Sequence, residues 1–176
     1  IHGGFKVMNQ QHVTFEELTV VHQSWHGLTL EGSETNVDVL KCVVKKCKYT
    51  GMFVTEGATV TATECEFMEN GACGVCCQDA NTKARLNDCK MHHNVYHGLV
   101  AVGPVVVDLH GTKTDIHSNK QRGIVAYDRG KVNIHLPSQH NTSHDNVGED
   151  RVHQNMFGAS GSIANINADG SFTHVV

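Results

Sequence analysis

Five side chains able to transfer protons or bind cations recur in the second half of the chain at one spacing. Lys90, Asp115 and His140 are 25 residues apart, and so are His92 and His117. If the spacing is one structural repeat, these groups share one outer face on three adjacent coils. Imidazole, carboxylate and ammonium groups together could abstract a proton next to a sugar carboxylate. They are the candidate catalytic residues.

The same groups allow two other interpretations. His92, His117 and Asp115 carry imidazole and carboxylate ligands that could hold a divalent metal ion. They could also form a solvated sheet face on which opposite charges pair between neighbouring strands. Each such pair would contribute little to the stability of the fold. The choice depends on the elements that position them.

A glycine repeat defines those elements. Six glycines lie 23, 24, 23, 24 and 25 residues apart, and most open a short apolar stretch, as in Gly98-Leu99-Val100-Ala101: Gly4, Gly27, Gly51, Gly74, Gly98 and Gly123. A fixed period of this length is typical of a solenoid. Each repeat holds three short segments in which every second residue is apolar, such as Ala84 with Leu86, Cys89 with Met91, and Leu99 with Ala101. We therefore predict an all-β solenoid with three strands per coil.

A polar position four residues before each glycine completes the repeat. It reads Gln23, Cys47, Asn70, Asn94, Asn119 and His144. Asparagines repeated on stacked coils can hydrogen-bond to one another and to turn backbone. The pattern Asn-Xaa-Xaa-Xaa-Gly-apolar-Xaa-apolar, as in 94–101 and 119–126, resembles the right-handed parallel β-helix, or pectate-lyase-like, superfamily over about residues 1 to 155. The resemblance implies a single-stranded right-handed parallel β-helix of about six to seven coils.

The repeat weakens towards the C-terminus. Residues 1–136 are expected to form the coils, and residues 137–176 an irregular last coil and cap of the same domain, with further strands within 160–167 and 172–176. The first coil looks cut in half, so we expect a longer parent chain.

Cysteine usage bears on the compartment. Cys42, Cys65 and Cys89 share one inward position on consecutive coils, where free thiols pack as small apolar groups. Seven apparently unpaired cysteines favour a reducing intracellular compartment, whereas Asn141 begins a glycosylation sequon that matters only in a secreted protein. Cys73 and Cys76 form a Cys-Xaa-Xaa-Cys motif with no obvious second pair for zinc.

Composition narrows the partners. The net charge of −4 and the absence of a large basic cluster argue against nucleic acid, and no apolar run is long enough to span a bilayer. We therefore expect neither nucleic acid nor a membrane as a partner.

Superfamily enzymes carry motifs that are mostly missing here. The paired aspartates and Gly-His-Gly of polygalacturonases and the Asp-Pro-His of alginate epimerases are absent. For a pectate-lyase-like site, Asp108, Asp115, Asp128, Arg122 and Arg129 are the residues that could be recruited.

Two hypotheses follow. The first is a non-catalytic binding or scaffold module that presents a flat face to a protein or glycan partner, as the resemblance to the β-helix repeats of F-box proteins implies. The second is a polysaccharide-active enzyme, a uronate lyase or C5-epimerase, with Lys90, His92, Asp115, His117 and His140 at its centre. Such an enzyme could need a divalent cation such as calcium, and no other cofactor is expected.

Overall fold

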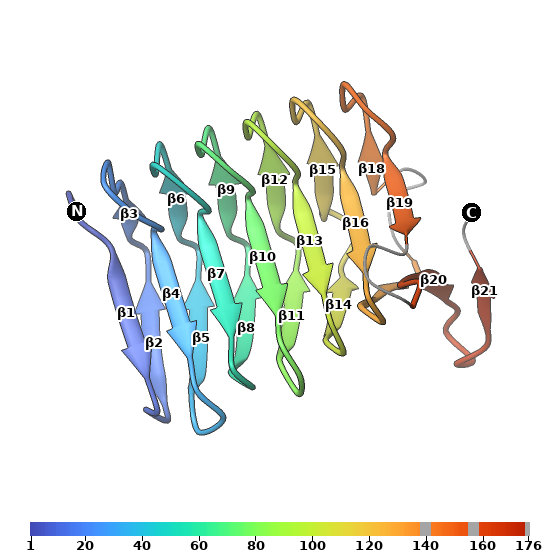
Figure 1. Cartoon of the computed structure of the whole chain (residues 1–176), viewed down its shortest axis with the longest axis horizontal. Coiled ribbons are helices and arrows are strands. Elements are labelled where there is room, and N and C mark those ends of the chain that lie inside the picture. The colour runs from blue at the N-terminus through green and yellow to red at the C-terminus, as the bar shows by residue number, and fades with distance from the viewer. Residues whose placement is uncertain (138–141, 155–158, 175–176) are drawn as a thin grey trace.

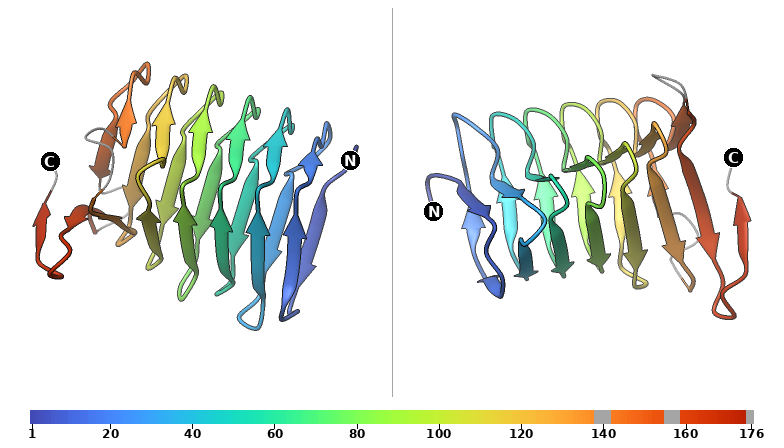
Figure 2. Two further views of the ribbon diagram at one scale, coloured as in Figure 1. Left: turned by 180° about the vertical axis from the view of Figure 1, so that it is seen from behind. Right: turned by 60° about the horizontal axis from the view of Figure 1, so that its bottom comes forward.

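The chain folds into a parallel β-solenoid whose coils stack along one axis, with the two termini at opposite ends (Figure 1). The structure, a computed structural model, describes residues 1–137, 142–154 and 159–174. Three sheets run the length of the stack, and Figure 2 shows them from two further directions. The predicted all-β parallel β-helix with three strands per coil is confirmed.

The glycine-led strands form the first sheet: β1 (Phe5–Met8), β4 (Leu28–Glu31), β7 (Met52–Thr55), β10 (Val75–Gln78), β13 (Leu99–Val102), β16 (Ile124–Tyr127) and β19 (Arg151–Gln154). The second sheet holds β2 (Val13–Glu16), β5 (Asn36–Leu40), β8 (Thr59–Thr63), β11 (Lys83–Asn87), β14 (Val106–His110), β17 (Lys131–His135), β20 (Ser162–Ile166) and β21 (Phe172–His174). The third holds β3 (Thr19–Val20), β6 (Val43–Lys45), β9 (Glu66–Met68), β12 (Lys90–His92), β15 (Asp115–His117) and β18 (Ser143–His144).

The C-terminal segment continues all three sheets. Strands β18, β19 and β20 pair in parallel with β15, β16 and β17, and β21 adds the antiparallel strand at the end. Strands β20 and β21 lie within the two segments where further strands were predicted. The expected boundary between coils and cap at residue 136 stays a prediction.

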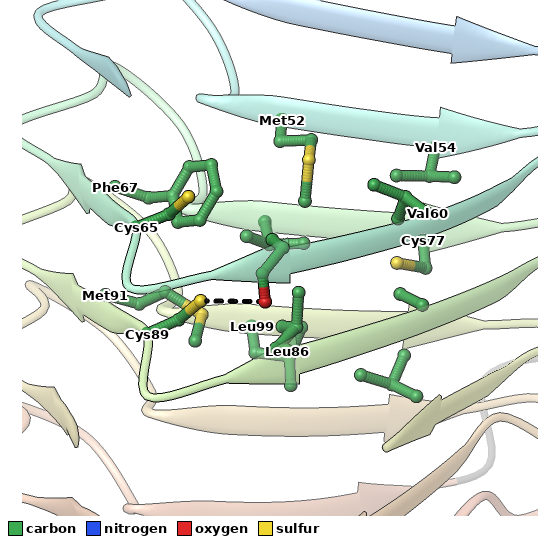
Figure 3. Packing of buried hydrophobic residues seen from close by; sticks show 14 of the residues in the cluster. Met52, Val54, Val60, Cys65, Phe67, Cys77, Leu86, Cys89, Met91 and Leu99 are labelled. Atoms are coloured by element: carbon green, nitrogen blue, oxygen red, sulfur yellow. Dashed lines mark hydrogen bonds between the residues drawn. The ribbon is translucent and has the colours of Figure 1, made fainter. Parts of the chain in front are cut away.

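The core lies between the three sheets and consists of the alternating positions that the repeat predicted. Val37, Val39, Leu86 and Leu99 have no exposed surface. Cys42, Cys65 and Cys89 are also buried, and each thiol donates a hydrogen bond to a carbonyl of the preceding coil. Figure 3 shows the bond from Cys89 to the Ala62 carbonyl, 3.4 Å long, among the packed side chains. The prediction that these cysteines are core thiols is confirmed.

The asparagine ladder is a continuous chain of buried hydrogen bonds. The Nδ2 of Asn70 donates to Oδ1 of Asn94 at 3.0 Å, and the Nδ2 of Asn94 donates to Oδ1 of Asn119 at 2.9 Å. Each asparagine also accepts the backbone N–H of the one before it. The glycines are needed beside this ladder, since a Cβ on Gly51 would lie 2.7 Å from both Asn70 Nδ2 and the Gly74 carbonyl oxygen.

The ladder ends on a different residue from the one predicted. Asn119 donates to Oδ1 of Asn146 at 2.8 Å, so His144 does not occupy the ladder position. Ile116 pairs with Ser143, 27 residues on, whereas Leu109 pairs with Ile134 after 25. Two extra residues between β17 and β18 shift the register of every later position, and a constant period could not reveal them.

We predict that Asn94→Ala destabilises the solenoid. The substitution removes two donated bonds and leaves the Asn70 side chain and backbone N–H without their Asn94 acceptor, all in a fully buried site. Buried groups left unsatisfied cost about 1–3 kcal/mol each, so the expected loss is about 3 kcal/mol or more. Urea unfolding measures it, with Asn36→Ala on the exposed face of β5 as control. Equal unfolding midpoints for the two variants would contradict the ladder's structural role.

Candidate functional site

The third sheet brings most of the predicted site residues onto one outer face. Lys90 of β12 pairs with Asp115 of β15, and His92 pairs with His117. On the next coil His117 pairs with His144 of β18. The juxtaposition expected from the 25-residue spacing is therefore present for Lys90, His92, Asp115 and His117.

His140, the fifth predicted residue, lies outside the described residues. The two extra residues before β18 place His144 beside His117. They also bring Thr142 to the adjacent coil next to Asp115, where the Thr142 carbonyl accepts the backbone N–H of Ile116. His144 is thus the histidine that the constant spacing missed. We call His92, His117 and His144 the histidine column.

The rings of the histidine column stack face to face. The centroids of His92 and His117 lie 4.9 Å apart with planes 4° apart, and those of His117 and His144 lie 5.4 Å apart at 14°. Because the rings repeat with the coils, their nitrogens form a row and do not converge on a single point.

Carboxylates flank the column and bind its outer members. The Nε2 of His92 bonds Glu66 Oε1 at 2.8 Å. His144 donates from Nε2 to Asp115 Oδ1 at 3.0 Å and from Nδ1 to Asp145 Oδ2 at 2.9 Å. Two donated bonds require both ring nitrogens to carry hydrogen, which is the cationic imidazolium form.

The neighbouring histidines His117 and His144 have pKa values displaced in opposite directions. The hydrogen bond that His144 donates to Asp145, together with Asp115, raises the pKa of His144. Burial lowers the pKa of His117, and the adjacent His92 and His144 oppose its protonation further, although Asp115 acts against them. At a pH between the two pKa values, the charged imidazole of His144 therefore lies against the neutral imidazole of His117.

Lys90, at the start of β12, also borders a depression next to the column. With Glu66, Asp88 and Lys113 it lines an open depression of about 280 Å³ along the corner between the second and third sheets. Any ligand there would meet ammonium and carboxylate groups together.

The best-grouped metal-ligand side chains are on another sheet. Among the described residues, the three side chains whose ligand atoms all lie within 4.8 Å of one another are Asp108, His110 and His135. They lie on β14 and β17, whereas the predicted candidates His92, His117 and Asp115 form no such group in that part of the chain. Sequence reasoning singled out Asp108 and missed the two histidines, although they too are 25 residues apart.

The Cys-Xaa-Xaa-Cys motif lies against the first sheet's outer apolar cluster. Cys73 and Cys76 pack beside Val100 and Val102. Burial raises the pKa of Cys73 to about 11 and that of Cys76 well above its ordinary value. Protonated thiols are poor nucleophiles and poor metal ligands, so these cysteines are suited to packing.

Exposed apolar side chains concentrate at one edge of the solenoid. The edge consists of the turns between the third and first sheets, which run along the upper side in Figure 1. Five of the eight exposed large hydrophobic residues in the described chain lie there: Trp25, Tyr49, Val95, Tyr96 and Val147. We call this edge the turn ridge.

Aromatic rings cluster at the N-terminal end of the turn ridge. Trp25 and Tyr49, on adjacent coils, meet edge to face with centroids 5.2 Å apart. His26 contacts both rings and stacks on Phe53 at 4.8 Å. Trp25 and Tyr49 nevertheless remain 54% and 37% exposed, so much of each ring is open to a ligand.

Fold and surface together define a parallel β-solenoid with one aromatic edge. The family model described as "Right handed beta helix region" matches residues 3–172, and the chain belongs to this family. No match was found among curated proteins or among solved structures. No helix in the described part of the chain has the length and hydropathy needed to span a membrane.

We predict that His144 titrates above its ordinary pKa of 6.5 and His117 below it. Because the folded pKa of His144 is raised, its contribution to stability is complete below pH 6.5 and is lost as the pH rises through the folded value. Asp145→Asn should lower the pKa of His144. Proton NMR titration of the ring signals measures both values, with Asp169→Asn in the turn between β20 and β21 as control. A His144 midpoint below that of His117 would refute this assignment.

Proposed function

We propose that this chain is a non-catalytic β-helix module that binds a linear polysaccharide along the turn ridge. The observation that supports it is the concentration of exposed apolar and aromatic side chains on that edge. Large exposed apolar groups gathered in one place mark an interaction surface, whereas scattered ones need no explanation.

The chemistry of the ridge favours a sugar polymer over a protein. Trp25, Tyr49 and Tyr96 each offer an apolar ring with a polar N–H or O–H, which suits a ligand that has C–H faces and hydroxyl edges. The coil after Tyr49 presents Ala72 at the same place, because backbone bonds stack residues 25, 49, 72 and 96 in one row. The rings are thus spaced along a line and do not form the broad apolar centre of a protein interface.

Polar groups lie beside the rings. The ammonium of Lys48 lies 5.4 Å from the Tyr49 ring centroid. An open depression of about 260 Å³, lined by His2, Gly3, Val21, His22, Gln23 and Ser24, precedes Trp25. These groups offer hydrogen bonds and positive charge to hydroxyl or uronate groups of a bound chain.

The sole tryptophan, Trp25, makes the proposal directly testable. Affinity electrophoresis through neutral and uronate polysaccharides should retard the wild type, and its tryptophan fluorescence should change on binding. Trp25→Ala and Tyr49→Ala should each weaken binding about tenfold or more, because truncating an aromatic anchor costs about 1–2 kcal/mol.

Met8→Ala is the matched control, since Met8 is 47% exposed but lies in β1. It should bind like the wild type. Unretarded migration through every polysaccharide would refute the glycan proposal. Capture of a purified protein by the wild type, lost in Trp25→Ala, would then assign the ridge to a protein partner.

The histidine column supports a second candidate, a uronate lyase or C5-epimerase. Neighbouring imidazoles whose pKa values are displaced in opposite directions provide a base and an acid at one pH. In this scheme neutral His117 abstracts the proton, Lys90 binds the uronate, and Asp115 holds the charged histidine of the next coil. His92, buried and bonded to Glu66, supports the His117 ring by stacking. A divalent cation such as calcium would neutralise the sugar carboxylate.

The second candidate predicts turnover of uronate polymers, with or without a divalent cation. Unsaturated products would report elimination, and proton NMR of the C5 configuration on alginate would report epimerisation. His117→Gln should lower the rate at least about 100-fold, whereas Trp25→Ala should leave the chemical step unchanged. A wild-type protein that yields neither product refutes this candidate.

A further inference from the structure

The outer face of the second sheet carries a group of possible metal ligands that neither proposed function uses. Asp108 and His110 are two residues apart on β14, so their side chains lie on the same face. Asp108 pairs with Asn133 on β17, and His135 follows two residues later on that strand. The pleat and the coil register therefore bring Asp108, His110 and His135 together on two adjacent coils.

The three side chains are in contact. The His110 and His135 rings stack with centroids 3.9 Å apart and planes 13° apart. The Nε2 of His135 donates to Asp108 Oδ1 at 2.8 Å. One ligand atom from each residue lies within 4.8 Å of the other two, which is close enough for small side-chain movements to place all three around one ion.

The donor set selects a class of ion. Two imidazole nitrogens and one carboxylate oxygen suit Zn²⁺, Co²⁺ or Ni²⁺, whereas Ca²⁺ and Mg²⁺ prefer oxygen ligands alone. Three protein ligands also leave a coordination position open, as in catalytic zinc sites. The side chains of His135 and Asp108 are 31% and 33% exposed, so water could reach that position.

Neighbouring groups hold the ligands in place. Asn133 donates from Nδ2 to Asp108 Oδ1 at 3.0 Å and so orients the carboxylate. The stacked His110 and His135 rings also restrict each other's orientation.

We propose that Asp108, His110 and His135 form a binding site for one divalent transition-metal ion with an open coordination position. The site is on a different sheet from the histidine column and does not depend on either function proposed above. In the metal-free state His135 Nε2 donates to Asp108. To ligate the ion through Nε2, His135 gives up that hydrogen to solvent and, as a neutral imidazole, carries its remaining hydrogen on Nδ1.

Titration with Co²⁺ followed by visible absorption, and with Zn²⁺ by calorimetry, tests the site in the intact chain. We expect one ion per chain, held by nitrogen and oxygen ligands, and no thiolate charge-transfer band. His110→Gln and His135→Gln should each weaken binding at least about 100-fold, since even a residue that only orients a ligand is worth 10- to 100-fold. His153→Gln, at an exposed histidine of β19 on the first sheet, is the matched control and should leave binding unchanged.

Circular dichroism establishes that each variant is folded, and Asp108→Asn provides a ligand change of minimal volume if a histidine variant is not. Wild-type affinity in folded His110→Gln, His135→Gln or Asp108→Asn would overturn the proposal. So would an equal loss in His153→Gln, or a thiolate spectrum that assigns the ion to cysteines.

Discussion

In-register stacking of the coils is the constraint on which the rest of this structure depends. The strands from β1 to β20 pair in parallel with their counterparts one coil away, so each side chain lies above the equivalent position of the next coil. The buried row Asn70, Asn94 and Asn119 ties the turns together, and the glycines allow the backbone of one coil to approach the next. A residue in this fold is therefore chosen largely for its compatibility with a copy of itself.

That condition explains which residue types form rows. An amide both donates and accepts, so asparagines satisfy one another in the buried turn. Thiols stack because each donates to a carbonyl of the preceding coil. Imidazoles can also stack as rings, and here burial lowers the pKa of His117 while the hydrogen bond to Asp145 raises the pKa of His144. The carboxylates of Asp115 and Asp145 accept hydrogen bonds from His144 and stabilise its positive charge.

Because stacking repeats, the period of the sequence predicted the three sheets, the buried positions and the pairing of His92 with His117. It failed where the period changed. Two additional residues before β18 moved the ladder from His144 to Asn146 and put His144 beside His117, and no local pattern marks such an insertion. His110 and His135 carried the periodic signal but were missed, because Asp108 was considered apart from its pleat neighbours. The turn ridge was missed because periodicity identifies buried positions and does not rank exposed ones.

The outward positions are free of the packing constraint, and their chemistry changes along the axis. The coils of β3 to β7 carry Trp25, Tyr49 and Phe53 on the turn ridge and beside it, whereas the coils of β12 to β18 carry the histidine column and the Asp108, His110 and His135 group. Both sets are attached to one continuous core, so the distance between them is fixed by the number of intervening coils. The turn ridge follows the row of stacked turns between the third and first sheets, so the linear partner proposed for it would lie along the axis. The Asp108, His110 and His135 group is on the second sheet, so ion binding there and polymer binding on the ridge use separate faces of one core.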